Sequence, residues 1–326
     1  MNETTVGPTG RSPVAGFTRW FLLRGNRLLV SLAVLLGIGA VFFVVGVLGI
    51  ATVTTPSRVM WYLNGAVNGL LTLVPISVGV NQIILSHEFG SIQDLYERRT
   101  DITSFRERVE ERTDTAVSSP YASTFFETLL SSVSDAAGAL QRGRDRSKDD
   151  RATGEIESIA ESVVEHADRA NDELAANGTS MLQTLFVVLS YDNSQQFHEI
   201  RRLQNEFPDR DAETGEELQR ITELFVEIDV ARQFLKTVVV ERQLACLSRL
   251  LICSGILAVT IAVVGIFTYR DLAGLVVPRT LLVIIAGTII VGTLVPLVIL
   301  GAYILRVATI ARYTAAYGPF IPESSD

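Results

Sequence analysis

Four stretches of the chain contain no charged residue, and they divide it into apolar and polar blocks. They span residues 28–51, 59–85, 250–268 and 280–305. A helix needs about 20 apolar residues to cross a hydrocarbon core of roughly 30 Å, and its backbone amides must be paired there. A buried core helix, the alternative, is typically only about 10 to 14 residues long. We therefore predict four membrane-spanning helices, and a buried soluble helix for the short apolar run 181–189.

The polar block between the second and third stretches has apolar residues at helical spacing and few alternating runs, which predicts helices rather than strands. The second span is expected to continue as one helix along an apolar face made of Phe89, Ile92, Leu95, Ile102, Phe105 and Val109. Further helices are expected at 121–140, 155–176 and 179–207. The charged, glycine-flanked segment 143–154 is expected to be a mobile linker.

The last helix of this block leads directly into the third span. Its apolar residues recur at the spacing of a coiled-coil seam, namely Ile221, Leu224, Ile228, Ala231, Leu235, Val238 and Ala245. The seam packs either against the helix that leaves the second span or against another copy of the chain. The sequence leaves both arrangements open.

Together these elements predict an all-α integral membrane protein. Its four transmembrane helices form two hairpins, with a helical cytoplasmic domain inserted between spans two and three. The expected parts are an N-terminal tail (1–27), a first hairpin (28–85), the acidic helical domain (86–249), a second hairpin (250–305) and a C-terminal tail (306–326).

Arginine and lysine residues near the spans predict the orientation, because cytoplasmic flanks are enriched in them. Twelve lie in the two tails and beside the spans in the central block, whereas the short loops 52–58 and 269–279 hold only Arg58, Arg270 and Arg279. Both termini and residues 86–249 are therefore expected in the cytoplasm, in a multi-pass protein of the cell membrane.

Composition indicates the solvent in which the protein works. The chain of 326 residues carries a net charge of −8, and its mean hydropathy is +0.32. Residues 86–249 hold 19 basic and 32 acidic side chains, and only two of the 28 basic residues are lysines. Concentrated salt screens such acidic self-repulsion, so we expect a halophilic protein. The same acidity excludes nucleic acid as a partner, because phosphate binding needs a basic face.

No pattern of catalytic residues occurs in the sequence. It has no glycine-rich phosphate loop with a lysine, no cysteine or histidine pair at metal-ligand spacing, and no nucleophile elbow. His87, His166 and His198 are scattered along the chain. We therefore expect no enzymatic activity, no cofactor and no bound metal.

The second span carries a polar stripe along one side. Polar, glycine and proline residues recur there within an arc of about 80°, namely Asn64, Asn68, Thr72, Pro75, Gly79, Gln82 and Ser86. In lipid such side chains face water or another helix. The stripe therefore either lines an aqueous path or holds a partner helix. Pro75 is expected to bend the helix in either case.

The third span presents a face of small residues. These are Ser254, Ala258, Ala262 and Gly265, and their spacing predicts close helix packing. No acid or base lies within any span, which disfavours a proton- or cation-coupled transporter.

The order of two spans, a helical cytoplasmic block and two further spans resembles that of bestrophin-type channels. Pro75-Ile76-Ser77 with Gly79 and Val80 is similar to the pore-lining stretch of that family. Ser86-His87-Glu88 stands where the family has a bulky aromatic and arginine pair. The resemblance implies a homopentamer with an anion pathway along span two. The longer segments 81–90, 191–204 and 227–251 resemble uncharacterised haloarchaeal membrane proteins, which implies no activity.

Two functional hypotheses follow. The first is a homo-oligomeric, passive, anion-tolerant pore, in which amides replace ion hydration and no fixed charge traps the ion. Its lining is expected to be Asn64, Asn68, Thr72, Gly79 and Gln82. The second is a membrane-anchored scaffold or sensor whose cytoplasmic stalk helices bind a protein partner. The expected partners are thus the lipid bilayer, further copies of the chain and a cytoplasmic protein.

Overall fold

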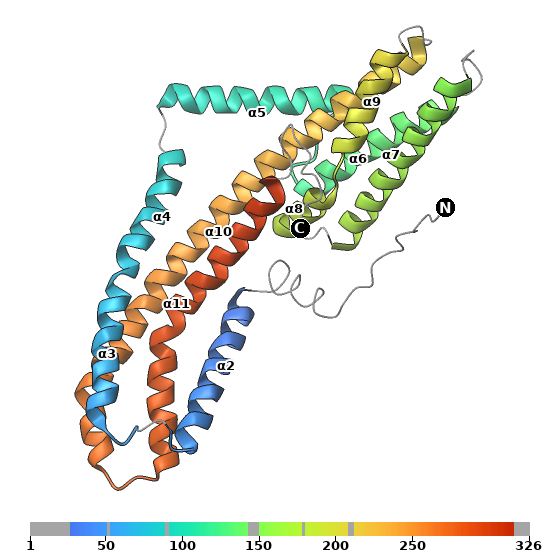
Figure 1. The fold of residues 1–326 in the computed structure, drawn as a ribbon. Helices are drawn as coiled ribbons and strands as arrows, with labels where there is room; N and C mark the ends of the chain where they lie inside the picture. Colours follow the sequence, from blue (N-terminus) through green and yellow to red (C-terminus); the bar gives the residue numbers. More distant parts are fainter. Residues whose placement is uncertain are drawn as a thin grey trace, which may run out of the picture. The chain divides into compact units, whose positions relative to one another are not determined.

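The computed structural model describes residues 27–50, 53–88, 91–142, 150–177, 180–207 and 212–315, and this part of the chain is helical without strands (Figure 1). The helices are α2 (Arg27–Val47), α3 (Pro56–Leu71), α4 (Leu73–Glu88), α5 (Ile92–Arg112), α6 (Ala122–Arg142), α7 (Asp150–Asn177), α8 (Met181–Ser190), α9 (Ser194–Glu206), α10 (Ala212–Gly274) and α11 (Arg279–Ala315). The all-α prediction is confirmed, and the grouping into two hairpins stays a prediction.

The chain divides into two compact units. The first unit contains Met1–Phe89 and Glu241–Ala311, and the second contains Gly90–Val240 and Arg312–Asp326. The helix α10 is unbroken over 63 residues and supplies both units (Figure 1). This confirms that the last helix of the polar block runs directly into the third apolar stretch.

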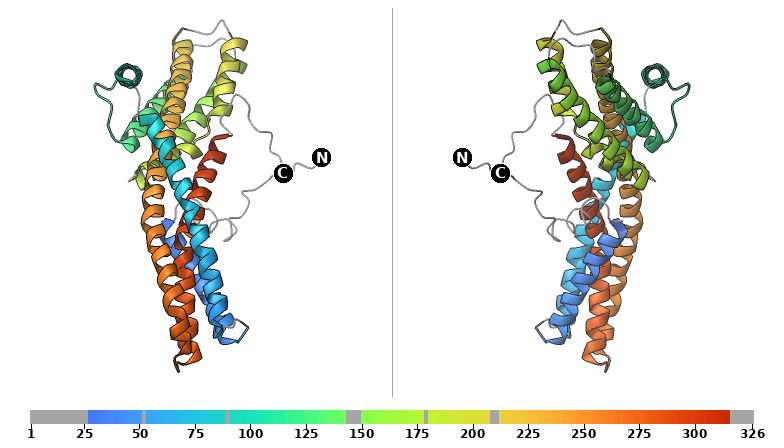
Figure 2. Two further views of the ribbon diagram at one scale, coloured as in Figure 1. Left: turned by 90° about the vertical axis from the view of Figure 1, so that its left-hand side faces the viewer. Right: turned by 90° about the vertical axis from the view of Figure 1, so that its right-hand side faces the viewer.

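Four helical segments are long and apolar enough to cross a membrane, as predicted from the charge-free stretches. They lie in Arg27–Val47, Pro56–Gly79, Ala212–Gly274 and Arg279–Ile310. In the first unit, α2, α3, the later part of α10 and α11 lie side by side (Figure 2). The predicted second span is interrupted at Thr72, whose backbone N–H and hydroxyl both donate to the carbonyl of Gly69. Pro75 follows in the first turn of α4, where a missing N–H costs little.

Two apolar clusters hold the first unit together. One gathers Val53, Val59, Leu63, Ala262, Tyr269, Leu282, Val283 and Ala286. The other gathers Leu70, Leu73, Leu247, Leu251, Ala258, Ile299, Leu300 and Tyr303. The Tyr269 hydroxyl, fully buried, donates to the carbonyl of Val53 at 2.7 Å, so the polar end of this large side chain is satisfied.

The second unit is a bundle in which α6 and α7 pack together and α8 and α9 pack on α7. The predicted buried helix at 181–189 is confirmed as α8, with Leu185, Val187 and Val188 in the core. The first part of α10 buries Ile221, Leu224 and Ile228 completely. Farther along, Val239 and Leu247 are buried and Ala245 is exposed, so the predicted seam leaves its register after Leu235.

Three predicted boundaries in the polar block were wrong. The second span does not continue as one helix, because Ser91 caps a new helix, α5, and exchanges hydrogen bonds with Asp94 in a capping box. The predicted helix at 179–207 is two helices, α8 and α9, separated at 191–193, where Asp192 accepts a bond from the Ser194 backbone. Helix α7 begins at Asp150, inside the predicted linker, whose residues 143–149 lie outside the described part.

Candidate functional site

Helix α3 has two chemically different faces. Val59, Leu63 and Leu70 are buried in the two clusters of the first unit. Asn64 and Asn68 lie on the other side of the helix and are exposed. At 100° per residue a helix separates such faces cleanly. The chain thus packs its own helices against the apolar face and leaves the amides on the outside of the unit.

A groove of 730 Å³ runs beside this polar face, between α3, the start of α4 and α11. Asn64, Asn68 and Thr72 contribute to its lining from one side, and Thr293 and Leu297 contribute from α11. Within the groove, the Tyr62 and Thr293 hydroxyls are 3.0 Å apart. Sequence reasoning missed both residues, since nothing in the sequence indicates which α11 residue faces α3.

The polar face also lets another backbone approach closely. Gly65 and Gly69 are both exposed, and a Cβ built on either would meet no atom within 4 Å. Within the described residues, the Asn64 and Asn68 side chains have no hydrogen-bond partner. The spacing Gly65-x-x-x-Gly69 is the pattern with which apolar helices pack tightly, so the sequence contains a signal for this face in addition to its polar residues.

The stripe continues on α4, where a buried serine lies next to it in the sequence. Pro75 and Gln82 are exposed, and Gly79 is half-buried. Ser77, next to the stripe, is buried, and its hydroxyl lies 3.2 Å from that of Ser248 on α10. The Ser86 side chain lies outside the described part. Apart from half-buried Gly79, the predicted stripe from Asn64 to Gln82 is therefore exposed on the first unit, while Ser77 makes a polar contact inside it.

The small residues predicted on the third span lie against neighbouring helices. Ala258, Ala262 and Gly265 are buried. A Cβ built on Gly265 would lie 2.9 Å from Leu63 Cδ1 and 3.3 Å from Ile289 Cγ2, so a larger residue there would require the Leu63 and Ile289 side chains to shift. Ser254 is half-buried and donates to the Leu250 carbonyl of its own helix.

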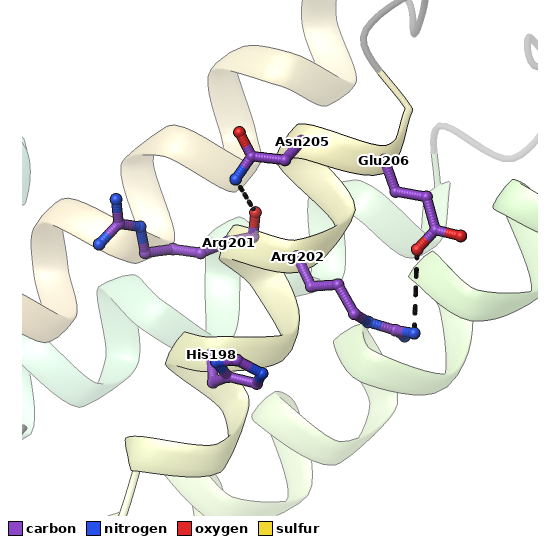
Figure 3. Close-up of a pocket in the computed structure, with 5 residues that line it drawn as sticks. All are labelled: His198, Arg201, Arg202, Asn205 and Glu206. Atoms are coloured by element: carbon purple, nitrogen blue, oxygen red, sulfur yellow. Dashed lines mark hydrogen bonds and ion pairs between the residues drawn. The ribbon is translucent and has the colours of Figure 1, made fainter. Parts of the chain in front are cut away.

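A second hollow, of 550 Å³, lies beside α9 and is lined by His198, Arg201, Arg202, Asn205 and Glu206 (Figure 3). All five side chains come from one helix. Asn205 donates to the Arg201 carbonyl, and Arg202 pairs with Glu206 at 3.9 Å and with Glu155 of α7 at 3.1 Å. These are ordinary contacts of a solvated helix surface. Among the residues that line this hollow, the polar contacts described are therefore those that stabilise α9 and its packing on α7, and they do not form a binding site.

Some of the polar groups of the second unit lie near Tyr191, among them His166 and Arg232. Burial raises the pKa of the Tyr191 phenol, which keeps it protonated. Arg232 donates to the Tyr191 carbonyl at 2.8 Å, and His166 Nδ1 lies 3.2 Å from Gln196 Nε2. Within the described ranges, no group of three or more histidine, cysteine or acidic residues could hold a metal ion. The side chain of His87 lies outside the described part.

One family is similar to this chain over nearly its whole length. A family described as being of unknown function (DUF7972) matches residues 2–326, so the chain belongs to that family. No curated protein and no solved structure matches the chain. The resemblances to bestrophin-type channels and to haloarchaeal membrane proteins remain predictions.

Proposed function

We propose that this member of the DUF7972 family is a multi-pass membrane protein that forms a homo-oligomeric passive pore. The observation that carries the proposal is the direction of the polar stripe, since Asn64, Asn68 and Thr72 lie on the outside of the first unit. The alternative use of the stripe is packing against another helix. Asn64 and Asn68 share a groove with α11 but form no hydrogen bond to its described residues, which favours water or a second copy as the partner of the stripe.

The chemistry of the stripe suits passive conduction. Asparagine and glutamine offer N–H donors and carbonyl acceptors, so they can replace part of the hydration of an ion without holding it by a fixed charge. Fixed carboxylates, which would select cations, are absent from residues 59–85, and the amides can offer N–H donors to an anion. Exposed Gly65 and Gly69 allow neighbouring copies to pack closely around such a path.

The orientation proposed from the arginine and lysine distribution has both termini and residues 86–249 in the cytoplasm. Protease treatment of intact cells tests it, since the second unit must then be protected. Cleavage within α7 on intact cells would reverse the orientation.

The second candidate, a membrane-anchored sensor, is favoured by one observation. The unbroken helix α10 belongs to both units, so a change within the second unit acts on a helix that also packs in the first. This hypothesis requires a stoichiometric cytoplasmic partner. Purification of the full chain from its membrane tests for that partner.

Conductance of the purified protein in planar bilayers tests the pore. Asn68→Leu is expected to change the conductance severalfold, because it removes an amide from the path. Thr72→Val and Thr260→Val form a matched pair, since both threonines are exposed and donate to a carbonyl of their own helix, at 2.6 and 2.9 Å. Only Thr72→Val should alter conductance. Equal effects of the two threonine variants, or the absence of any conductance, would contradict the proposal.

A further inference from the structure

The second unit contains a cavity of 580 Å³ that the proposed pore does not use. It lies between α5, α6, the loop that joins them, and the first part of α10. Its lining is largely aromatic and aliphatic and includes Ile102, Phe105, Tyr121, Phe125 and Phe234. A volume of this size with an apolar wall is typical of small-molecule sites.

The walls of the cavity are held by contacts around it. Glu227 of α10 is buried and forms ion pairs with Arg112 and, at 3.4 Å, with Arg108, which fixes α5 against α10. The connecting loop is fixed at Ser118, whose backbone N–H and hydroxyl both donate to Glu110 at 2.7 Å. These hydrogen bonds lower the pKa of Glu110. The cavity is therefore formed before any ligand arrives.

The chain leaves this apolar surface unfilled. Phe234 is 56% exposed and Tyr121 is 73% exposed, although both lie in a unit whose surface is rich in charge. A contiguous exposed apolar surface that is bordered by polar residues is typical of an interaction or ligand-binding site. Water is a poor occupant, because the wall offers it few hydrogen-bond partners.

The charged residues of the lining select the ligand. Arg98 and Arg106 contribute two guanidinium groups, and Asp101 contributes one carboxylate. Arg106 donates one N–H to the Ser118 carbonyl, interacts electrostatically with Glu110, and retains further N–H donors. An anionic group next to an apolar body thus complements the N–H donors of the two guanidinium groups and the apolar wall.

From these features we propose that the cavity binds a free single-chain amphiphile with one carboxylate headgroup. The alkyl chain of this ligand lies against Phe105, Phe125 and Phe234, and its carboxylate lies between Arg98 and Arg106. This site is independent of the proposed pore.

Photolabelling tests the site in the full-length protein, reconstituted in phosphatidylcholine nanodiscs. The probe is decanoate that carries a diazirine on its chain, and peptide mapping locates the labelled residues. Label is expected on peptides that contain Tyr121 or Phe234. Unlabelled decanoate should compete better than octanoate by about fourfold for each methylene, at equal free concentration.

Matched variants distinguish the contribution of the arginines that contact the headgroup from that of the apolar wall. The double variant Arg98→Gln, Arg106→Gln should weaken competition by decanoate about tenfold, and it should leave competition by neutral decanol unchanged. Arg99→Gln, at the neighbouring position outside the lining, is the control. Phe234→Glu should abolish labelling, whereas Val226→Glu, at another exposed apolar residue of α10, should preserve it.

Three results would overturn the proposal. Label spread over other peptides would place the probe elsewhere. Equal competition by decanol and decanoate in the unmodified protein would show that no anionic group is recognised. Equal loss of labelling in Phe234→Glu and Val226→Glu would mean that added charge, and not the cavity, controls the signal. The pore proposal is untouched by any of these outcomes, because its test is conductance.

Discussion

Helix α2 packs on α11 at several close contacts, and Gly46→Ala tests the closest approach of a glycine in α2, to Val283. A Cβ at Gly46 would lie 2.5 Å from Val283 Cγ1 and 3.1 Å from Cγ2. Valine in a helix strongly prefers one χ1 rotamer, so its methyl groups cannot turn away without cost. Overpacking of this kind costs about 1–3 kcal/mol. Alanine regains about 0.5–1 kcal/mol over glycine in a helix, so we expect a net loss of about 0–2.5 kcal/mol, with about 1 kcal/mol at the centre of that range.

Gly37→Ala on the same helix is the matched control. A Cβ at Gly37 meets no atom within 4 Å, so only the gain of about 0.5–1 kcal/mol remains. Thermal unfolding of the purified protein in one detergent, followed by circular dichroism, measures both variants. Gly46→Ala should unfold at a lower temperature than the wild-type protein and Gly37→Ala at the same or a higher one. If the two variants behaved alike, the packing of α2 on α11 described above would be wrong.

Two further predictions concern the second unit. Arg112→Ala leaves the buried carboxylate of Glu227 with only the more exposed Arg108, so it should cost about 2–3 kcal/mol, against about 0–1 kcal/mol for Arg108→Ala. Equal costs in thermal unfolding would refute this assignment. The pKa of Glu110 is lowered in the fold by the donors of Ser118, so its contribution to stability is present above the unfolded pKa and is lost as pH falls through the folded one. Glu110→Gln should therefore flatten the acid side of the stability profile and leave its slope above pH ~6 unchanged; an unaltered acid side would contradict the role given to Ser118.

Much of the fold could be predicted because lipid imposes a simple rule. A span must be long, apolar and helical, and residues 28–51, 59–85, 250–268 and 280–305 satisfy that rule without reference to any partner. The helix boundaries of the polar block were harder to predict. A capping residue can begin a new helix even where the apolar spacing continues across it, as at Ser91. The Ser91 and Asp94 pair was visible in the sequence, and it outweighed the periodicity that favoured one long helix.

The candidate site shows a different limit. Periodicity correctly separates Asn64 from Leu63 on α3, because both positions follow from one helix. It does not say which other helix packs on Leu63, and that contact depends on Gly265, about two hundred residues later in the chain. The cavity of the second unit was likewise invisible, since Phe105 and Phe234 look like core residues until their surroundings are known.

Cysteine accessibility along α3 and α4 tests the central claim most directly. The two native cysteines, Cys246 and Cys253, are first replaced by serine, and single cysteines are then introduced into the membrane-embedded protein. A pore predicts that a charged, membrane-impermeant maleimide labels cysteines at Asn64, Asn68 and Gln82. Cysteines at Leu63 and Leu70 should stay unlabelled. Silence along the whole stripe, or labelling of the buried face instead, would contradict the account.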